Sequence, residues 1–169
     1  MYNRDPYTFA NHTSIPPSII RPIHSVLRSW DMPNTDYTYT QAFSPTGVLH
    51  VIDTPANGRE EIHHLHAAMI DPENGPVVDV QHYLDQLFVL PGERKDEEDK
   101  KDGRTEVIFT GSVVSYLKDG QQIKAGFASW VILSPCEEKE RPGELQVDYW
   151  RAFHDTANLV AAIAGLAGN

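Results

Sequence analysis

Four long segments with the composition of β-strands fill the second half of the chain, and they restrict the possible fold more than any other feature. They are rich in β-branched and aromatic residues, and they span residues 77–90, 105–117, 121–133 and 144–154. Lys118-Asp119-Gly120 joins the second segment to the third, and Asp-Gly is a favoured pair in tight hairpin turns. The sequence therefore predicts a long antiparallel meander.

Helical patterns precede and follow this meander. In residues 18–30 the apolar side chains recur at intervals of three and four, which predicts a helix; Pro22 is tolerated because it lies near the first turn. A short helix over 37–43 and a short strand over 48–52 come next. Asn57 and Glu60 form a predicted capping box for a helix that ends near residue 70, and Asp155 caps a last helix over 156–166.

This order of elements predicts the fold class and the domain organisation. Helices, then a meander, then a helix indicate an α+β fold in which helices cover one face of a curved, mostly antiparallel sheet. We expect a cone-shaped α+β barrel, in which residues 18–169 form a single domain and residues 1–17 form an irregular N-terminal arm. The length of 169 residues suits one domain that has room for a core and a cavity.

Charge and cysteine content limit the partners and the compartment. The net charge of -10 disfavours nucleic acid and anionic lipid as partners. Cys136 is the single cysteine, so no disulfide forms within the chain, and the absence of a secretory signal predicts a cytoplasmic location. The apolar run over 159–166 is too short to span a bilayer.

The predicted strand faces carry polar residues at their centres. Side chains alternate across a strand, and on this basis His82 and Gln86 share an apolar face with Phe88, while Ser129 shares one with Phe127. Arg151 and Tyr149 share a third apolar face. A buried polar group without a partner costs about 1–3 kcal/mol, so these groups either satisfy one another or line a pocket that receives a ligand.

Three short motifs resemble a known family. Val80-Gln81-His82-Tyr83 resembles the Thr-Gln-His-Phe strand of scytalone dehydratase, whose His is catalytic, and Ser29-Trp30-Asp31 resembles its Ser-Tyr-Asp segment, whose Tyr and Asp are functional. Ser44-Pro45-Thr46 resembles an Ala-Pro-Thr that precedes the next strand. With the order of elements over residues 18–160, these motifs identify a resemblance to the nuclear-transport-factor-2-like superfamily, including its SnoaL-like cyclases.

The resemblance implies an activity and also shows where this chain departs from the dehydratase. Enzymes of the superfamily often catalyse cyclisation, isomerisation, rearrangement or dehydration without a cofactor, in secondary metabolism. In this chain Trp30 replaces the Tyr, the 48–52 strand has no matching second Tyr, and the 105–117 strand has no second His. The resemblance therefore carries over the fold and the pair of Asp31 and His82, but not the dehydratase's own substrate.

His82 is the leading catalytic candidate. An imidazole titrates near neutral pH and suits proton transfer, and an acidic neighbour would orient it. Asp31 is the expected neighbour, and Asp36 is the competing choice. The alternative for His82 is a core histidine bonded to a backbone carbonyl.

The remaining candidates contact or surround the substrate. Arg151 either binds a substrate carbonyl or pairs with Asp85 or Asp148 as scaffolding. Ser129 and Gln86 orient the ligand. The pocket walls are assigned to Trp30, Phe88, Phe127 and Tyr149.

No metal or cofactor is expected. His63, His64 and His66 lie close together, but they lack the His-Glu-x-x-His spacing of zinc enzymes and are interpreted as surface histidines. The sequence has no glycine-rich phosphate loop and no dinucleotide fingerprint.

Two functions remain open at this point. The first is a cofactor-free lyase or isomerase that acts on a polyketide-like or polycyclic intermediate. The second is a non-catalytic ligand-binding or protein-interaction module on the same fold. A homodimer is also predicted, because six apolar residues fall on the faces expected to point outward: Tyr83, Leu87, Val89, Trp130, Ile132 and Trp150.

Overall fold

The computed structural model describes residues 5–32, 37–51, 54–91, 103–138 and 141–167. Its helices are η1 (His12–Ser14, a single 3-10 turn), α1 (Pro17–Trp30), α2 (Tyr39–Ala42), α3 (Gly58–Met69) and α4 (Ala157–Ala167). Its strands are β1 (Phe43–His50), β2 (Ala56–Asn57), β3 (Val77–Val89), β4 (Thr105–Leu117), β5 (Gln122–Pro135) and β6 (Leu145–His154). The predicted meander and the long flanking helices are confirmed.

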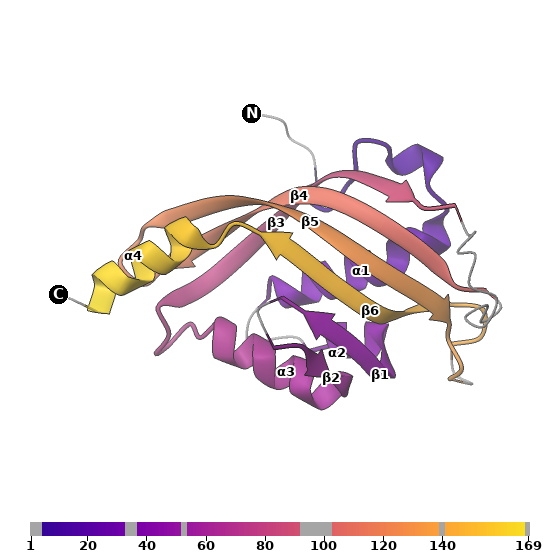
Figure 1. Cartoon of the computed structure of the whole chain (residues 1–169), viewed down its shortest axis with the longest axis horizontal. Helices are drawn as coiled ribbons and strands as arrows, with labels where there is room; N and C mark the ends of the chain where they lie inside the picture. Colours follow the sequence, from indigo (N-terminus) through magenta and orange to yellow (C-terminus); the bar gives the residue numbers. More distant parts are fainter. Residues whose placement is uncertain (1–4, 33–36, 52–53, 92–102, 139–140, 168–169) are drawn as a thin grey trace.

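The strands form one curved sheet in the order β2-β1-β6-β5-β4-β3 (Figure 1). The meander from β3 to β6 is antiparallel, and β1 joins it as a parallel neighbour of β6. The predicted α+β class and the curved, mostly antiparallel sheet are confirmed. The expected cone is confirmed as an open one: β2 and β3 are the two ends of the sheet and do not pair with each other in the described part of the chain, so the sheet does not close into a barrel.

The N-terminal arm protects the β3 edge of the sheet. The Leu84 N–H donates to the carbonyl of Pro6 at 2.8 Å, and the Ala10 N–H donates to the carbonyl of Asp85 at 2.7 Å. An uncovered edge strand presents unpaired backbone groups that favour aggregation. The arm is therefore a structural part of the domain, although it has little regular secondary structure.

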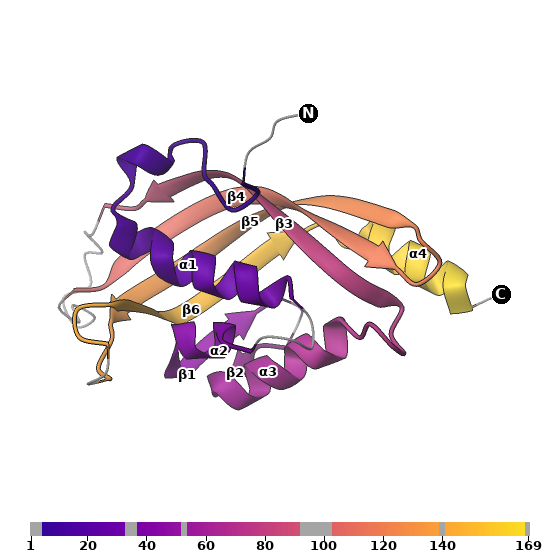
Figure 2. The same cartoon turned by 180° about the vertical axis from the view of Figure 1, so that it is seen from behind.

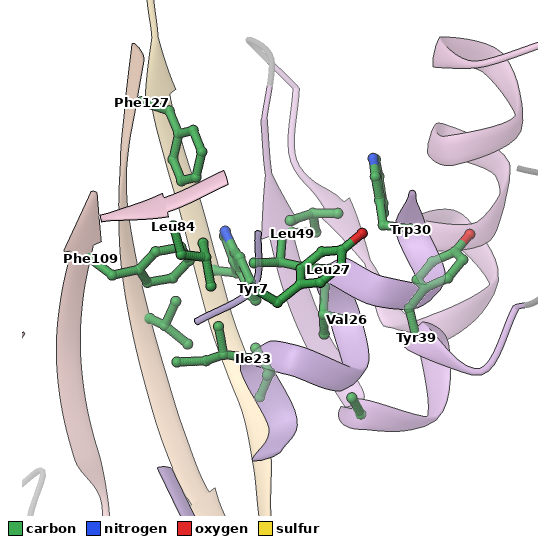
Figure 3. Close-up of a cluster of buried hydrophobic side chains, with 14 of the residues drawn as sticks. Tyr7, Ile23, Val26, Leu27, Trp30, Tyr39, Leu49, Leu84, Phe109 and Phe127 are labelled. Atoms are coloured by element: carbon green, nitrogen blue, oxygen red, sulfur yellow. The ribbon is translucent and has the colours of Figure 1, made fainter. Parts of the chain in front are cut away.

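The core lies between the sheet and α1, which crosses one face of the sheet (Figure 2). Figure 3 shows Ile23 and Leu27 of α1 in one cluster with Leu84 and Phe109 of the sheet. The three- and four-residue spacing in α1 puts its apolar side chains on one stripe, and all of them are buried.

A β-bulge reverses the faces of β3 after Leu84. Between the pairs Leu84–Gly111 and Leu87–Phe109, β3 advances three residues while β4 advances two, and an extra residue of this kind flips the alternation that follows it. Leu87 consequently points into the core and is 1% exposed, whereas Phe88 is 51% exposed. The predicted inward placement of Gln86 and Phe88 is therefore wrong.

A second irregularity does the same to β6. Leu133 pairs with Val147, but the adjacent Ile132 pairs with Tyr149, so β6 contains one extra residue at Asp148. Trp150 therefore turns inward and is 4% exposed. With Leu87 and Trp150 buried, the outer apolar face is smaller than the sequence suggested, and the homodimer stays a prediction.

His66 is a core residue, which corrects its interpretation as a surface histidine. It lies on α3, is 1% exposed, and its Nε2–H donates to the carbonyl of Trp30 at 2.9 Å. The rings of Trp30 and Tyr39 pack against it. Because burial disfavours the imidazolium form, the pKa of His66 lies below its ordinary value of 6.5.

We expect the free energy of unfolding to fall as the pH drops below 6.5. The folded-state pKa of His66 is depressed, so in this window the unfolded chain binds more protons than the folded chain, and acidification favours unfolding. Burial likewise lowers the pKa of His24 and His154. Urea unfolding between about pH 8 and about pH 5 measures this slope. His66→Gln should reduce the slope and His64→Gln, at an exposed site, should not; a flat profile would contradict the prediction.

Candidate active site

A pocket opens between the concave face of the sheet and the C-terminal ends of α1 and α3. Its volume is about 110 Å³, several times the roughly 10–15 Å³ that one water molecule requires. Most of its wall is apolar, and Leu159 of α4 lies at one side. Its polar wall residues are His82, Ser115, Ser129, His154, Asp155 and Thr156.

His82 and Asp31 meet at this pocket although they are 51 positions apart in sequence. His82 Nδ1 lies 2.6 Å from Asp31 Oδ1, and the His82 backbone N–H donates to Asp31 Oδ2 at 2.7 Å. The Asp31 side chain is 1% exposed, while that of His82 is 16% exposed. Helix α1 ends at Trp30 and leaves Asp31 at its C-cap, where the carboxylate faces the centre of β3.

Two further side chains hold the Asp31 carboxylate in place. The Tyr7 hydroxyl donates to Asp31 Oδ2 at 2.9 Å, and the Gln81 amide donates to the same oxygen at 3.1 Å. The Gln81 amide also contacts the Tyr7 oxygen at 3.0 Å. Burial and the neighbouring Asp31 carboxylate raise the pKa of Tyr7, so the phenol keeps its proton and remains a donor.

This network determines the tautomer of the neutral His82 ring. An ionised carboxylate only accepts hydrogen bonds, so the proton shared with Asp31 Oδ1 belongs to His82 Nδ1. The other ring nitrogen, Nε2, then has a free lone pair. Because His82 is a wall residue of the pocket, Nε2 is the ring nitrogen available to a ligand. The arrangement is that of an imidazole base oriented by a carboxylate.

Three other predicted residues lie on the same pocket wall. Trp30 closes the α1 side. Phe127 contacts the His82 ring edge-on, with centroids 5.5 Å apart, and a Cβ atom at Gly111 would lie 2.7 Å from Phe127 Cζ, so the glycine makes room for this ring. Ser129 is buried, and its oxygen accepts a hydrogen bond from Trp150 Nε1 at 3.2 Å.

Four predicted residues do not reach the pocket. Gln86 and Phe88 follow the bulge in β3 and are exposed. Tyr149 packs against Trp130, with ring centroids 5.3 Å apart, and Arg151 is exposed, with its guanidinium 4.8 Å from the Phe153 ring centroid. Their assignment to the site is wrong, because one extra residue in β3 and another in β6 reverse the alternation of side chains on which it rests. Asp36, the competitor of Asp31, lies outside the described residues.

Sequence reasoning missed four residues of the site. Tyr7 lies in an arm with no periodicity, and Gln81 lies on the face of β3 opposite to the predicted pocket face. Ser115 and His154 are wall residues of the pocket, whereas the resemblance pointed to the 105–117 strand as the place for a second histidine. His154 turns toward the pocket only because of the extra residue in β6, for which the sequence carries no local signal.

The charges around the pocket are few. Its wall contains no lysine or arginine among the described residues, and Asp155 is its single carboxylate. Within the described ranges, no three His, Cys, Asp or Glu side chains lie close enough together to bind a metal ion. No helix in the described part of the chain has the length and apolar character needed to cross a bilayer.

This chain is similar to known proteins in its structure. No protein-family model and no curated protein matches the sequence. A protein from Catenulispora acidiphila in complex with S-DNPA aligns with a TM-score of 0.61 and 19% identity, over 85% of this chain and 95% of that chain. Hexachlorocyclohexane dehydrochlorinase LinA-type3 from Novosphingobium barchaimii LL02 aligns with a TM-score of 0.64 and 12% identity, over 82% and 84%. A nuclear transport factor 2-like superfamily protein from Salmonella enterica aligns with a TM-score of 0.59 and 12% identity, over 80% and 87%.

Proposed function

We propose that this chain, which has the nuclear-transport-factor-2-like fold, is a cofactor-free acid–base enzyme, an isomerase, cyclase or dehydratase. Its substrate would be an uncharged polyketide-like or polycyclic intermediate of secondary metabolism. One observation carries the proposal: a histidine on the wall of an apolar pocket is bonded through Nδ1 to a carboxylate that is almost completely buried.

The chemistry follows from the geometry of this pair. His82 Nε2 removes a proton from a carbon atom of the bound substrate, and the imidazolium that forms lies beside the Asp31 carboxylate, which compensates its charge. The same nitrogen then returns the proton to another position of the substrate, or a leaving group departs. Isomerisation, cyclisation and dehydration share the first of these steps.

The pocket wall supports an uncharged substrate. An anionic ligand would need a cationic partner, yet the described wall has no lysine or arginine and does contain Asp155. Apolar and aromatic side chains such as Trp30, Phe127 and Trp150 suit the flat faces of a ring compound. One structural neighbour is named for hexachlorocyclohexane dehydrochlorination. This name supports the proposal that a protein with this fold can catalyse elimination from an apolar ring.

The test uses a chromogenic probe of base catalysis in apolar pockets, 5-nitrobenzisoxazole. A base removes its carbon-bound proton, the N–O bond breaks, and a coloured cyanonitrophenolate forms. We expect the wild-type protein to catalyse this reaction and His82→Gln to lower the rate by about 100-fold, since a positioned general base contributes at least that much. Absorbance of the phenolate measures the rate.

The matched control is His64→Gln, the same substitution at an exposed histidine on α3, which should leave the rate within about twofold of wild type. A wild-type rate equal to that of the His82→Gln variant would overturn the proposal. That result would instead support a non-catalytic binding module.

A further inference from the structure

We infer that His154 is a second catalytic imidazole of the pocket, which donates an N–H hydrogen bond to the oxygen of a carbonyl substrate while His82 moves the proton at carbon. This inference rests on the proposed function and deepens it, because it specifies the substrate class as an enolisable ketone or a related carbonyl compound. It also assigns the base, His82, to β3 and the hydrogen-bond donor, His154, to β6.

The position of His154 provides the first support. It is the last residue of β6, and it lies on the pocket wall because the extra residue at Asp148 shifted the alternation of that strand. His154 pairs with Phe127 across the β5–β6 ladder, and directly opposed residues present their side chains to the same face. Phe127 in turn contacts the ring of His82, and all three side chains line the same pocket.

The separation of the two strands leaves room for a substrate between the histidines. Strands β3 and β6 are three positions apart in the sheet, which corresponds to about 14 Å at the usual strand spacing. The sheet is strongly curved (Figure 1), and both histidines line the pocket on its concave side, so the gap between the rings is smaller. A one- or two-ring compound fits this arrangement, with one histidine at each end.

The electrostatics of His154 suit a neutral donor. Burial, and then the positive charge that His82 can carry, lower the pKa of His154. The ring is therefore uncharged at neutral pH and keeps one N–H. Among the described residues the His154 ring has no hydrogen-bonding partner, which leaves its N–H available to a ligand. The adjacent Asp155 is the single carboxylate of the pocket wall.

The step balances without any further reactant. His82 Nε2 takes the α-proton of the ketone, and the electron pair of the C–H bond becomes the C=C bond of the enolate. The π electrons of the carbonyl move to oxygen, where the His154 N–H stabilises the developing negative charge. The proton on His82 then returns to carbon, at the same or a conjugated position, and the carbonyl forms again.

Two probe reactions separate the roles of the histidines. Deuterium uptake by 2-tetralone in heavy water, followed by proton NMR, requires a base and an oxyanion donor. Elimination of 5-nitrobenzisoxazole depends mainly on the base, because its leaving phenolate is already stabilised by the ring. We expect His154→Phe to slow tetralone exchange by about 100-fold and to slow benzisoxazole turnover at least about tenfold less than that.

Two further variants complete the design. His154→Gln restores an N–H donor and should recover about a tenth or more of the tetralone rate, while His64→Phe controls for the substitution at an exposed position. His82→Gln should slow both reactions. If His154→Phe and His154→Gln both leave tetralone exchange unchanged, or slow both reactions equally, the inference about His154 is overturned. If His82→Gln slows neither reaction, the proposed function itself fails.

Discussion

The Asp31→Asn variant is expected to lose about 100- to 10,000-fold of the benzisoxazole activity and about 2–4 kcal/mol of unfolding free energy. The activity is lost through the tautomer of His82. An asparagine amide would place an NH2 group opposite His82 Nδ1 while its oxygen keeps the three donors that now bind Oδ2. Nδ1 would then become the acceptor, and the proton would move to Nε2, which could no longer act as a base.

The stability loss has a separate cause. The carboxylate accepts four hydrogen bonds, from His82 Nδ1, the His82 backbone, Tyr7 and Gln81. Hydrogen bonds to a charged group contribute roughly twice as much as neutral ones. Replacing the charge by a neutral amide weakens all four, at about 0.5–1 kcal/mol each.

Three measurements check this prediction. The coloured phenolate reports activity, urea unfolding reports stability, and the nitrogen-15 shifts of the His82 ring report the tautomer. The control is Asp85→Asn, at an exposed carboxylate on the same strand, which should change activity less than about twofold and stability less than about 0.5 kcal/mol. A His82 ring that keeps its proton on Nδ1 in the Asp31→Asn variant would contradict the argument.

Phe109→Ala is expected to lower the free energy of unfolding by about 3–5 kcal/mol. Phe109 lies on β4 and is completely buried. Its ring makes edge-on contacts with Phe9 of the arm at 5.7 Å, Phe127 of β5 at 5.9 Å and Trp150 of β6 at 5.3 Å. Truncation removes these contacts and leaves a cavity where the arm meets three strands.

Urea unfolding monitored by tryptophan fluorescence measures the Phe109→Ala effect. The matched control is Phe153→Ala, because Phe153 is 48% exposed on β6 and its loss should cost less than about 1 kcal/mol. A difference of less than about 1 kcal/mol between the two variants would show that the ring cluster is not the centre of the core.

Much of the fold followed from local patterns. The apolar spacing of residues 18–30 predicted α1, and the turn at Lys118-Asp119-Gly120 predicted the β4–β5 hairpin, in which Gly120 adopts a φ of 88°. The predicted capping box located the start of α3 correctly, with Asn57 as its N-cap. The residue that accepts a hydrogen bond from the Asn57 backbone N–H is Glu61 rather than Glu60, at 2.7 Å. Periodicity and turn chemistry are properties of neighbouring residues, so they can be recognised in the sequence.

Only part of the candidate site could be predicted from the sequence. The strand pattern put His82 on the pocket face, and the resemblance of short motifs suggested Asp31 as its partner; the structure brings the two together. Alternation then failed for Gln86, Phe88, Tyr149 and Arg151. A single extra residue in a strand reverses every side chain after it, and nothing in the local sequence of β3 or β6 marks where the extra residue falls.

The sequence by itself determined the elements, the α+β class and the residue on which the chemistry is proposed to depend. The tertiary structure decided how the site is assembled: Tyr7 reaches Asp31 from the arm, Gln81 completes the network, and the bulge in β6 turns His154 toward the pocket. The physical reason is how far apart in the sequence the interacting residues lie. Helices, turns and strand alternation depend on residues a few positions apart, whereas a hydrogen-bond network across 24 to 74 positions and the register between strands depend on how the whole sheet packs.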